Sequence, residues 1–223
     1  MKGNLEMRFS VHSMMKNSFV LVRNDEEYES FCDRMLNAGF YEVPKRYIGK
    51  FPYGLSPVPR DRVGLVNCAL AHFSIVNMAL SMDWDHVTIF ESDAIPMIDC
   101  KNELGRLLEG GVPDDAQAIT FGSLHFIREN GRFLYDCDGR FGKIVKNLWG
   151  CHAVTIFGQG YRTWLDNFLS HDEEFHADWP NELLPHYYAT ARSYFVQWKD
   201  GHLDHGEHMV DKQNLSDFPV KGR

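Results

Sequence analysis

HVTIFESD, residues 86–93, is the stretch from which the fold is inferred. Residues 87–90 are an unbroken run of β-branched and aromatic side chains, typical of a strand buried on both faces of a parallel sheet. The run ends in Glu91, Ser92 and Asp93, so two carboxylates flank one small residue. Because ligands of open α/β sheets bind beyond the carboxyl ends of the strands, we expect this pair at the functional edge.

The spacing of the two carboxylates indicates a site for a hard divalent cation. Paired oxygen ligands suit such an ion, and the ion in turn suits a phosphate group. The alternative is that Glu91 and Asp93 only begin a solvated loop. The rest of the sequence has to decide between these two interpretations.

Length and composition predict one sizeable domain without a general nucleic-acid surface. The chain has 223 residues, of which 44% are hydrophobic and 24% are charged, as in ordinary globular domains. Its formal net charge of −8 argues against binding to nucleic-acid backbones. A nucleotide partner is therefore expected to be a small molecule held at a local site.

Cysteine usage and hydropathy predict a soluble, cytoplasmic protein. The five cysteines are widely spaced, with neither zinc-finger spacing nor a dense disulfide pattern, which favours a reducing compartment. We expect no membrane span, because no apolar run approaches the roughly 20 residues that one needs. The amino-terminal segment MKGNLEMRF lacks the apolar region of a signal peptide.

Residue patterns before the central strand predict alternating strands and helices. The expected elements are a strand at 8–13, a helix capped by Asn24 and ending near Leu36, a strand at 41–48, an irregular loop at 51–62 and a helix at 64–82. His72 lies on the apolar stripe of the last helix, where a hydrogen-bonded core histidine is commoner than a metal ligand. Both interpretations of His72 remain open at this point.

The same patterns continue after the central strand. The expected elements are a helix at 100–109, a strand at 116–122, a hairpin at 125–135 turning at Asn130-Gly131, a strand at 149–157, a helix at 161–169, a helical turn at 182–188 and a strand at 194–198. Strands and helices that alternate with short turns predict a single α/β domain. Its sheet should be mixed, mostly parallel and flanked by helices.

Five short segments follow one another in a set order: residues 67–72 (NCALAH), 91–94 (ESDA), 121–123 (FGS), 149–153 (WGCHA) and 179–184 (WPNELL). In this order they resemble glycosyltransferase family 25, the lipopolysaccharide and collagen-type glycosyltransferases, which have the GT-A, Rossmann-like fold. That family carries a Gly-Cys-x-x-Ser-His helix, a Glu-Asp-Asp-Ala strand end, two glycine-bearing strand segments and a late Pro-Val-Asp-x-x-Leu segment. The resemblance spans roughly residues 60–205.

The chain departs from these motifs at several positions. Asn67 and Ala71 stand where the family has glycine and serine, so close backbone approach and a hydroxyl are lost. Ser92 replaces the middle acid, although the outer pair keeps its spacing. The late aspartate aligns with Asn181 or Glu182, which leaves the identity of the catalytic base open.

The resemblance implies a transferase that moves a sugar from a nucleotide-diphosphate donor to a hydroxyl of a glycan, lipid-linked or protein acceptor. The charge of the departing diphosphate has to be neutralised, which a bound divalent cation does directly. Mn²⁺ is the expected ion, with Mg²⁺ as the alternative. Asp93 is then a direct metal ligand, and Glu91 holds the ribose or reaches the metal through water.

The resemblance also implies a further metal ligand from the C-terminal segment. GT-A enzymes often supply a histidine there, and this chain offers His202, His205 and His208, of which we favour His205. The alternative is a solvated tail. A structural zinc site at the tail is not expected, because the cysteines are distant in sequence.

An inverting transferase needs a general base for the acceptor hydroxyl, and Asp178 and Glu182 are the candidates. Asp178 directly precedes Trp179, whose ring would suit a sugar; the alternative is an ordinary acid in a polar loop. On this interpretation residues 1–123 bind the nucleotide-sugar, and residues 124–223 supply the acceptor side and the metal-binding tail.

The donor nucleotide is expected beyond the end of the first strand. Ser13, Arg62 and Asn67 are the candidate contacts, together with Glu91 and Ser92 at the end of the central strand. For Arg62 the alternative is an ordinary surface salt bridge.

Two other classes of function stay open. A metal-dependent hydrolase could use Glu91, Asp93 and the tail histidines, although the sequence shows no tight two-metal cluster. A non-catalytic nucleotide- or sugar-binding domain is compatible with the replacements at Asn67, Ala71 and Asn181.

Overall fold

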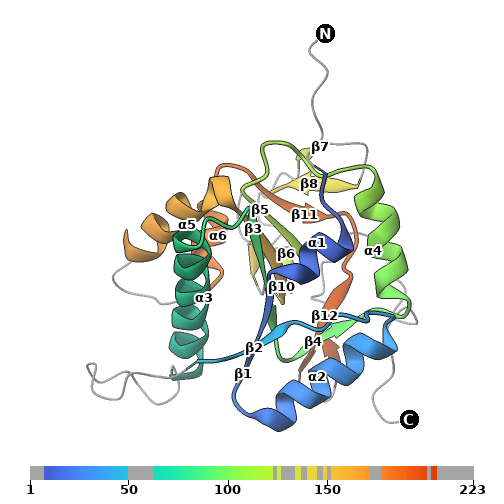
Figure 1. Ribbon diagram of the computed structural model, residues 1–223. Coiled ribbons are helices and arrows are strands. Elements are labelled where there is room, and N and C mark those ends of the chain that lie inside the picture. The colour runs from blue at the N-terminus through green and yellow to red at the C-terminus, as the bar shows by residue number, and fades with distance from the viewer. Residues whose placement is uncertain are drawn as a thin grey trace.

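An eight-stranded mixed sheet forms the centre of the protein (Figure 1). The computed structural model describes residues 8–49, 63–122, 125–126, 134–136, 140–144, 148–149, 152–170, 177–199 and 202–204. In spatial order the strands are β2 (Lys45–Ile48), β1 (Ser18–Val22), β3 (His86–Glu91), β10 (Ala153–Phe157), β5 (Ala118–Gly122), β11 (Tyr187–Thr190), β8 (Phe141–Lys143) and β7 (Leu134–Asp136).

Six of these strands run in the same direction. The pairs β2–β1, β1–β3 and β5–β11 are parallel. Strand β10 is antiparallel to both of its neighbours, β3 and β5, and β8 is antiparallel to both β11 and β7. The prediction of a single α/β domain with a mixed, mostly parallel sheet is therefore confirmed.

Two smaller sheets accompany the main one. The three-stranded sheet has the order β13-β12-β4, and the two-stranded sheet pairs β6 with β9. Their bounds are β4 (Ala94–Pro96), β12 (Phe195–Lys199), β13 (His202–Asp204), β6 (His125–Phe126) and β9 (Leu148–Trp149). Strand β4 begins three residues after the end of β3, so the three-stranded sheet lies at the carboxyl edge of the central strand.

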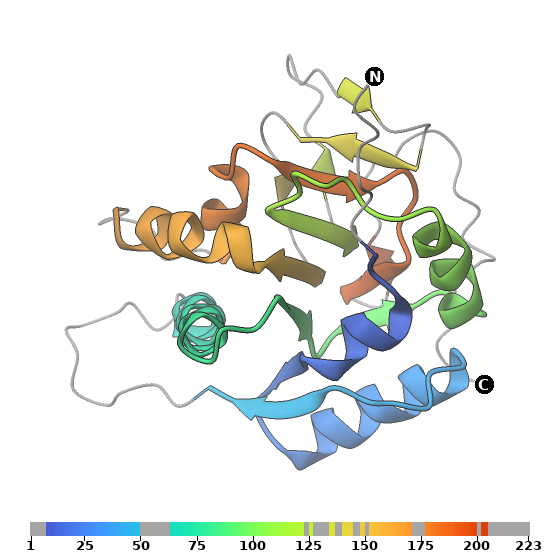
Figure 2. The ribbon, with the colours of Figure 1, turned by 45° about the horizontal axis from the view of Figure 1, so that its top comes forward.

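Helices cover both faces of the main sheet (Figure 2). Helices α3 and α5 lie side by side on one face, and α1, α2 and α4 pack on the other. The short helix α6 contacts α5. The bounds are α1 (Val11–Lys16), α2 (Asp25–Asn37), α3 (Val63–Ser81), α4 (Cys100–Glu109), α5 (Gly158–Ser170) and α6 (Trp179–Glu182).

Strand β3 is buried on both faces, as its unbroken apolar sequence predicts. Its side chains alternate between two cores, because successive residues of a strand point to opposite faces. Val87 and Ile89 belong to the core beneath α3 and α5, and Phe90 belongs to the core beneath α1, α2 and α4. By the same alternation Glu91 points to the α3 face, which determines the neighbours of its carboxylate.

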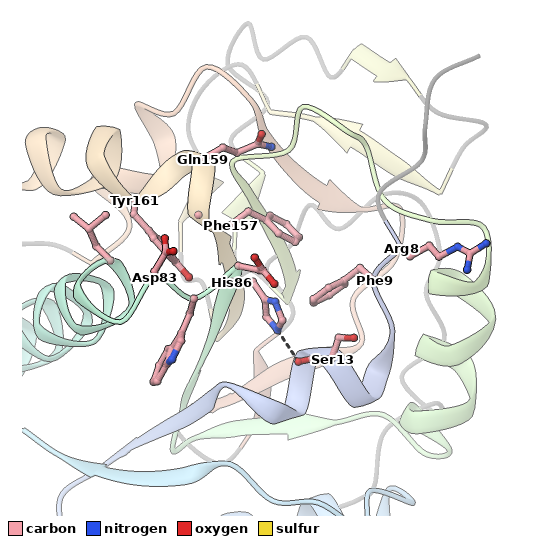
Figure 3. A pocket seen from close by; sticks show the side chains of 12 residues that line it. Arg8, Phe9, Ser13, Asp83, His86, Phe157, Gln159 and Tyr161 are labelled. Carbon is pink, nitrogen blue, oxygen red and sulfur yellow. Dashed lines mark hydrogen bonds between the residues drawn. The ribbon is translucent and has the colours of Figure 1, made fainter. Parts of the chain in front are cut away.

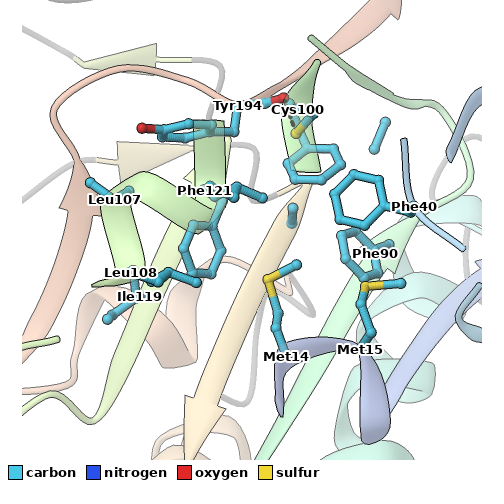
Figure 4. Close-up of a cluster of buried hydrophobic side chains, with 14 of the residues drawn as sticks. Met14, Met15, Phe40, Phe90, Cys100, Leu107, Leu108, Ile119, Phe121 and Tyr194 are labelled. Atoms are coloured by element: carbon cyan, nitrogen blue, oxygen red, sulfur yellow. Dashed lines mark hydrogen bonds between the residues drawn. The ribbon is translucent and has the colours of Figure 1, made fainter. Parts of the chain in front are cut away.

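The core beneath α1, α2 and α4 is rich in aromatic and sulfur-containing side chains (Figure 4). Met14 and Met15 approach the sheet from α1, and Phe90 and Phe121 meet them from β3 and β5. All four are at most 5% exposed. Burial of each such side chain stabilises the fold by about 1.5–3 kcal/mol, so α1 is fixed mainly by packing.

The expected strand at 8–13 is wrong. Residues 11–16 form helix α1, and the first strand begins at Ser18. Ser10 caps the helix, because its Oγ accepts a hydrogen bond from the Ser13 backbone N–H at 3.1 Å. The alternation of Phe9 and Val11 with polar residues imitated a strand, whereas the cap and the burial of the methionines favour a helix.

Three later expectations also need correction. Residues 125–135 do not form a simple hairpin, because β6 pairs with β9 and β7 pairs with β8; the expected turn at Asn130-Gly131 lies outside the described residues. The expected strand at 149–157 is divided between β9 and β10. The helix expected at 182–188 ends at Glu182, and β11 begins at Tyr187. The loop expected at 51–62 lies outside the described residues.

Helix α3 is more apolar than expected. Its segment Gly64–Ser81 is long and apolar enough, with a mean hydropathy of 1.4, to cross a membrane by length and composition alone. This criterion alone does not identify a membrane span, because the core helix of a globular domain meets it too. In the structure α3 packs against β3 and α5, and Ala69, Ile75 and Val76 enter the core beneath it. We interpret α3 as the central core helix of this face.

Gly122 allows two backbone segments to cross closely. A Cβ atom at this position would lie 2.3 Å from the Phe195 carbonyl oxygen, which belongs to backbone and has no room to withdraw. Gly122→Ala should therefore lower the free energy of unfolding by about 2 kcal/mol or more, as other overpacked sites do. Denaturant unfolding monitored by circular dichroism measures this change.

Gly105 in the middle of α4 provides the matched control. A Cβ atom there meets nothing within 4 Å, so Gly105→Ala should stabilise the protein by about 0.5–1 kcal/mol through helix propensity. Equal effects of the two substitutions would contradict the close crossing at Gly122.

Candidate metal centre

The carboxyl end of β3 carries the predicted pair of acids. Glu91 is the last residue of the strand, and Asp93 lies in the turn to β4. Arg34 of α2 holds this turn, because its guanidinium donates hydrogen bonds to the carbonyl oxygens of Ser92 and Ala94. The turn that carries the two acids is therefore held by a half-buried arginine rather than being a free loop.

Helix α3 brings a second set of polar side chains to Glu91. Cys68 and His72 are one helical turn apart and so lie on the same face of α3. The Cys68 thiol donates to Glu91 Oε1 at 3.4 Å. His72 is fully buried, and neither of its ring nitrogens has a hydrogen-bond partner among the residues that the structure describes. The interpretation of His72 as a hydrogen-bonded core residue is therefore not supported.

Strand β10 delivers His152, which the sequence analysis did not identify as a site residue. The backbone N–H of His152 donates to the Gly122 carbonyl at 3.1 Å, and its carbonyl accepts from the Glu91 N–H at 3.0 Å. This pairing places its Nδ1 3.3 Å from Glu91 Oε2. Within the described part of the chain, its Nε2 is buried without a hydrogen-bond partner. The one feature of the sequence that could have indicated His152 as a site residue is its position directly before a buried strand.

Asp93 is held from the side of β12. Its Oδ2 accepts a hydrogen bond from the Gln197 side chain, and its Oδ1 is buried with no partner in the described residues. Strand β13 pairs with β12 so that Asp204 is opposite Gln197. The tail thus runs beside the strand that holds Asp93, while the predicted ligand His205 lies outside the described residues.

Two groups of donor atoms are close enough to bind cations. The donors of Glu91, Asp93 and His152 lie within 4.8 Å of one another, as do those of Cys68, His72 and Glu91. In the first group the unpartnered atoms Asp93 Oδ1 and His152 Nε2 supply vacant lone pairs, provided that the imidazole is neutral. Two carboxylates and one imidazole suit a divalent cation such as Mn²⁺, so the residues present fit the expected group.

Burial and the neighbouring charges shift the pKa values of the pair formed by Glu91 and His152. Burial raises the pKa of Glu91, and its hydrogen bond to His152 only partly opposes this. Burial alone would lower the pKa of His152, but the hydrogen bond and charge of Glu91 together with the charges of Asp93 and Asp178 raise it. Both shifts favour a proton shared within the pair when no cation is bound.

Asp178 faces this centre from the amino end of α6. Burial is the largest influence on four groups here: it raises the pKa values of Cys68 and Glu91 and acts to lower those of His72 and His152. The negative charge of Asp178 acts to raise the pKa value of each of these groups. Glu182 lies one turn further along α6, and its backbone N–H donates to the Asp178 carbonyl at 3.2 Å. The charge of Asp178 therefore acts on the centre.

Asn181, one of the two positions with which the late aspartate of the family 25 motif could align, has a structural role. Its Oδ1 accepts from Trp164 Nε1 at 2.9 Å, and its amide donates to the Ala177 carbonyl at 3.3 Å. Asn181 is fully buried between α6 and α5. The amide thus positions α6, and with it Asp178.

The structure brings several of the remaining predicted residues to the same edge. Asn67 lies one residue before Cys68 on α3, with its Oδ1 buried and unpartnered within the described part of the chain. Ser92 lies between the two acids, and its side chain hydrogen-bonds with Glu27. Arg62 lies outside the described residues.

Ser13 lies at the opposite edge of the sheet, so the expectation that it lies beside the acids is wrong. Its carbonyl oxygen is 2.6 Å from Nε2 of His86, the first residue of β3 (Figure 3). It lines a cavity of about 430 Å³ together with Arg8, Asp83 and Tyr161. The position of Ser13 was wrongly predicted because residues 8–13 were expected to form a strand ending at Ser13, whereas Ser13 is part of α1.

Comparisons with known proteins show only distant similarity. No family model matches the chain, and no curated protein matches it. Among solved structures, A197 from STIV is similar with a TM-score of 0.41 and 15% identity, covering 89% of this chain and 97% of that chain. HddC from Yersinia pseudotuberculosis is similar with a TM-score of 0.35 and 11% identity, covering 81% of this chain and 72% of that chain.

A third similar structure is the Drosophila β-1,4-galactosyltransferase 7 mutant D211N in complex with manganese, UDP-Gal and xylobiose. Its TM-score is 0.33 at 14% identity, and the match covers 66% of this chain and 51% of that chain. At this distance none of these similarities assigns the chain to a family. The function has to be argued from the residues of the centre.

Burial of His72 should make stability depend on pH. Burial lowers its pKa from 6.5 to about 4, so between these pH values the unfolded chain binds a proton that the folded chain does not. In metal-free buffer the wild type should lose about 3 kcal/mol of stability relative to His72→Gln as pH falls through this window. Denaturant unfolding of both proteins at several pH values tests this. Parallel stability curves would show that His72 does not titrate as a buried neutral imidazole.

Proposed function

We propose that the protein is a metal-dependent glycosyltransferase that uses a nucleotide-diphosphate sugar as donor. One observation carries the proposal: Glu91, Asp93 and His152 meet at the carboxyl edge of β3, and Asp93 Oδ1 and His152 Nε2 are buried without partners in the described residues. Such donors suit a divalent cation, and a cation at this edge of an α/β sheet suits a diphosphate. The motif resemblance to glycosyltransferase family 25 supports the same proposal.

Asp93, Glu91 and His152 would hold the cation, and Gln197 keeps the Asp93 carboxylate in place. A cation held there, Mn²⁺ in the first place or Mg²⁺, would supply positive charge against the negative charge that develops on the diphosphate. His205 follows β13 in sequence, and we propose it as a further ligand because β13 pairs with the strand that carries Gln197.

Arg23 adds a positive charge to the proposed donor site. It follows β1, its side chain is 89% exposed and forms an ion pair with Glu27, and its charge also interacts with that of Asp93. An exposed guanidinium at the edge that binds phosphate can contact a donor phosphate oxygen. Asn67 and Arg62 are the proposed contacts to the nucleotide.

Asp178 is the proposed general base. It would take the proton of an acceptor hydroxyl on a glycan or glycoconjugate while that oxygen attacks the anomeric carbon. The proposal is supported by the charge of Asp178, which acts on Glu91 and His152 of the metal centre. Glu182, one turn away, is the alternative base.

A second candidate function is a nucleotide-binding domain without catalytic activity. Asn181 favours it, because this position, one of two that could align with the late acid of the family motif, holds a buried amide whose oxygen accepts a hydrogen bond from Trp164. The two functions differ in turnover, since only the first consumes the donor.

Asp93→Asn should abolish metal-dependent binding of the donor nucleotide and leave the fold intact. The substitution removes the charge while keeping the shape, and we expect Mn²⁺-dependent UDP affinity to fall by at least about tenfold. Calorimetric titration of UDP with and without Mn²⁺ measures this. Asp166→Asn, an exposed position on α5, is the matched control and should bind as the wild type does. Unchanged Mn²⁺-dependent affinity in Asp93→Asn would remove this carboxylate from the metal site.

Asp178→Asn should lower turnover by roughly 10² to 10⁴ and leave donor affinity nearly unchanged, because a base acts in the transition state. Donor consumption with glycan acceptors, measured alongside donor titration, separates the two effects. Glu182→Gln is the matched comparison and should retain most activity.

Each contrary result has a distinct meaning. Loss of donor affinity in Asp178→Asn would assign that carboxylate to the metal or nucleotide site. Donor hydrolysis that needs metal but no acceptor would identify a hydrolase. Tight donor binding without any turnover in the wild type would favour the non-catalytic function.

A further inference from the structure

The proposed transferase chemistry does not use the thiol and imidazole on the inner face of α3. Cys68 and His72 are four residues apart, so their side chains lie one above the other and face the same part of the sheet. The strand residue opposite them is Glu91, whose Oε1 accepts from the Cys68 thiol at 3.4 Å. The donor atoms of the three residues lie within 4.8 Å of one another.

The burial of His72 is a second, independent observation that points to a ligand for this group. The side chain is 0% exposed, and no described residue hydrogen-bonds to Nδ1 or Nε2. Leaving a buried polar group unsatisfied costs about 1–3 kcal/mol, and core histidines normally avoid this cost through a partner. One of the nitrogens lies within the donor group formed with Cys68 and Glu91.

We propose that Cys68, His72 and Glu91 form a zinc-binding site adjacent to the proposed Mn²⁺ site. Thiolate and imidazole select Zn²⁺ over Mn²⁺ and Mg²⁺, which prefer oxygen ligands. Three protein ligands leave the fourth tetrahedral position for water or a substrate atom. This inference goes beyond the proposed glycosyltransferase and does not depend on it.

The geometry requires only a small adjustment. Bonds of about 2.3 Å to sulfur and about 2.0–2.2 Å to nitrogen and oxygen place tetrahedral ligands roughly 3.3–3.7 Å apart. A group already within 4.8 Å reaches this spacing by side-chain rotation. Zinc binding displaces the thiol proton of Cys68 to solvent, so the site gains a thiolate as it gains the cation.

Glu91 connects the two sites. Its Oε1 faces Cys68, and its Oε2 lies 3.3 Å from Nδ1 of His152. One carboxylate can therefore offer one oxygen to each cation and bridge them. The negative charge of Asp178, which acts on both groups of ligands, favours the added positive charge.

Cobalt(II) binding tests the thiolate directly. Co²⁺ substituted for Zn²⁺ should give a sulfur-to-metal charge-transfer absorption in the near ultraviolet with the wild-type protein. Cys68→Ser should lose this absorption, and Cys32→Ser, which removes a thiol on α2, should retain it. Circular dichroism of the metal-free variants confirms that both are folded. A folded Cys68→Ser protein that keeps the absorption would overturn the proposal.

Zinc affinity, measured by competition with a chromophoric chelator, tests the imidazole and separates the two sites. His72→Gln should weaken zinc binding by at least about tenfold, whereas Asp93→Asn should leave it unchanged. Unaltered zinc affinity in folded His72→Gln would also overturn the proposal. If Asp93→Asn binds UDP with Mn²⁺ normally while His72→Gln loses zinc, the proposed transferase site fails and the zinc site stands.

Discussion

The contact between Glu91 and His152 is the constraint on which the metal centre depends. It exists because β10 runs antiparallel between two strands of the opposite direction, and so its first residues meet the last residues of β3. The backbone bond from Glu91 N–H to the His152 carbonyl, 3.0 Å long, fixes the register of this meeting. A parallel strand in the same place would carry the histidine to the other edge of the sheet.

Side-chain alternation along β3 then decides which helix completes the centre. Since Val87 and Ile89 face α3, Glu91 must face it too, and a slip of one residue would turn the carboxylate toward α1 and α2. The helical repeat of α3 brings Cys68 and His72 to that same face. The two-residue repeat of the strand and the helical repeat of α3 thus bring these three side chains together around the Glu91 carboxylate.

Local signals in the sequence were sufficient for the elements that position Glu91 and Asp93. The apolar run of β3, the Asn24 cap of α2 and the apolar length of α3 each act within one segment, and each predicted element is present. The pairing of β10 depends on contacts with β3 and β5, which are distant in sequence, and so the position of His152 before a buried strand did not show by itself that it lies beside Glu91. Ser13 was misplaced for a related reason: α1 is stabilised by burial of Met14 and Met15 under the sheet, which no local alternation reveals.

The charge balance of the centre links proton binding to cation binding. Three acids lie in one region: Glu91, Asp93 and Asp178. Among the described groups that shift the pKa of Glu91, His152 is the buried base. Without a cation, the raised pKa values of Glu91 and His152 allow this pair to hold a proton, which reduces the repulsion among the acids. A cation bound at the unpartnered Nε2 of His152 needs a neutral imidazole, so it must expel the second proton of a protonated His152. The residues that would bind the metal therefore also hold a proton in the metal-free state, and the large apolar cores on both faces of the sheet supply the stability that this polar region does not.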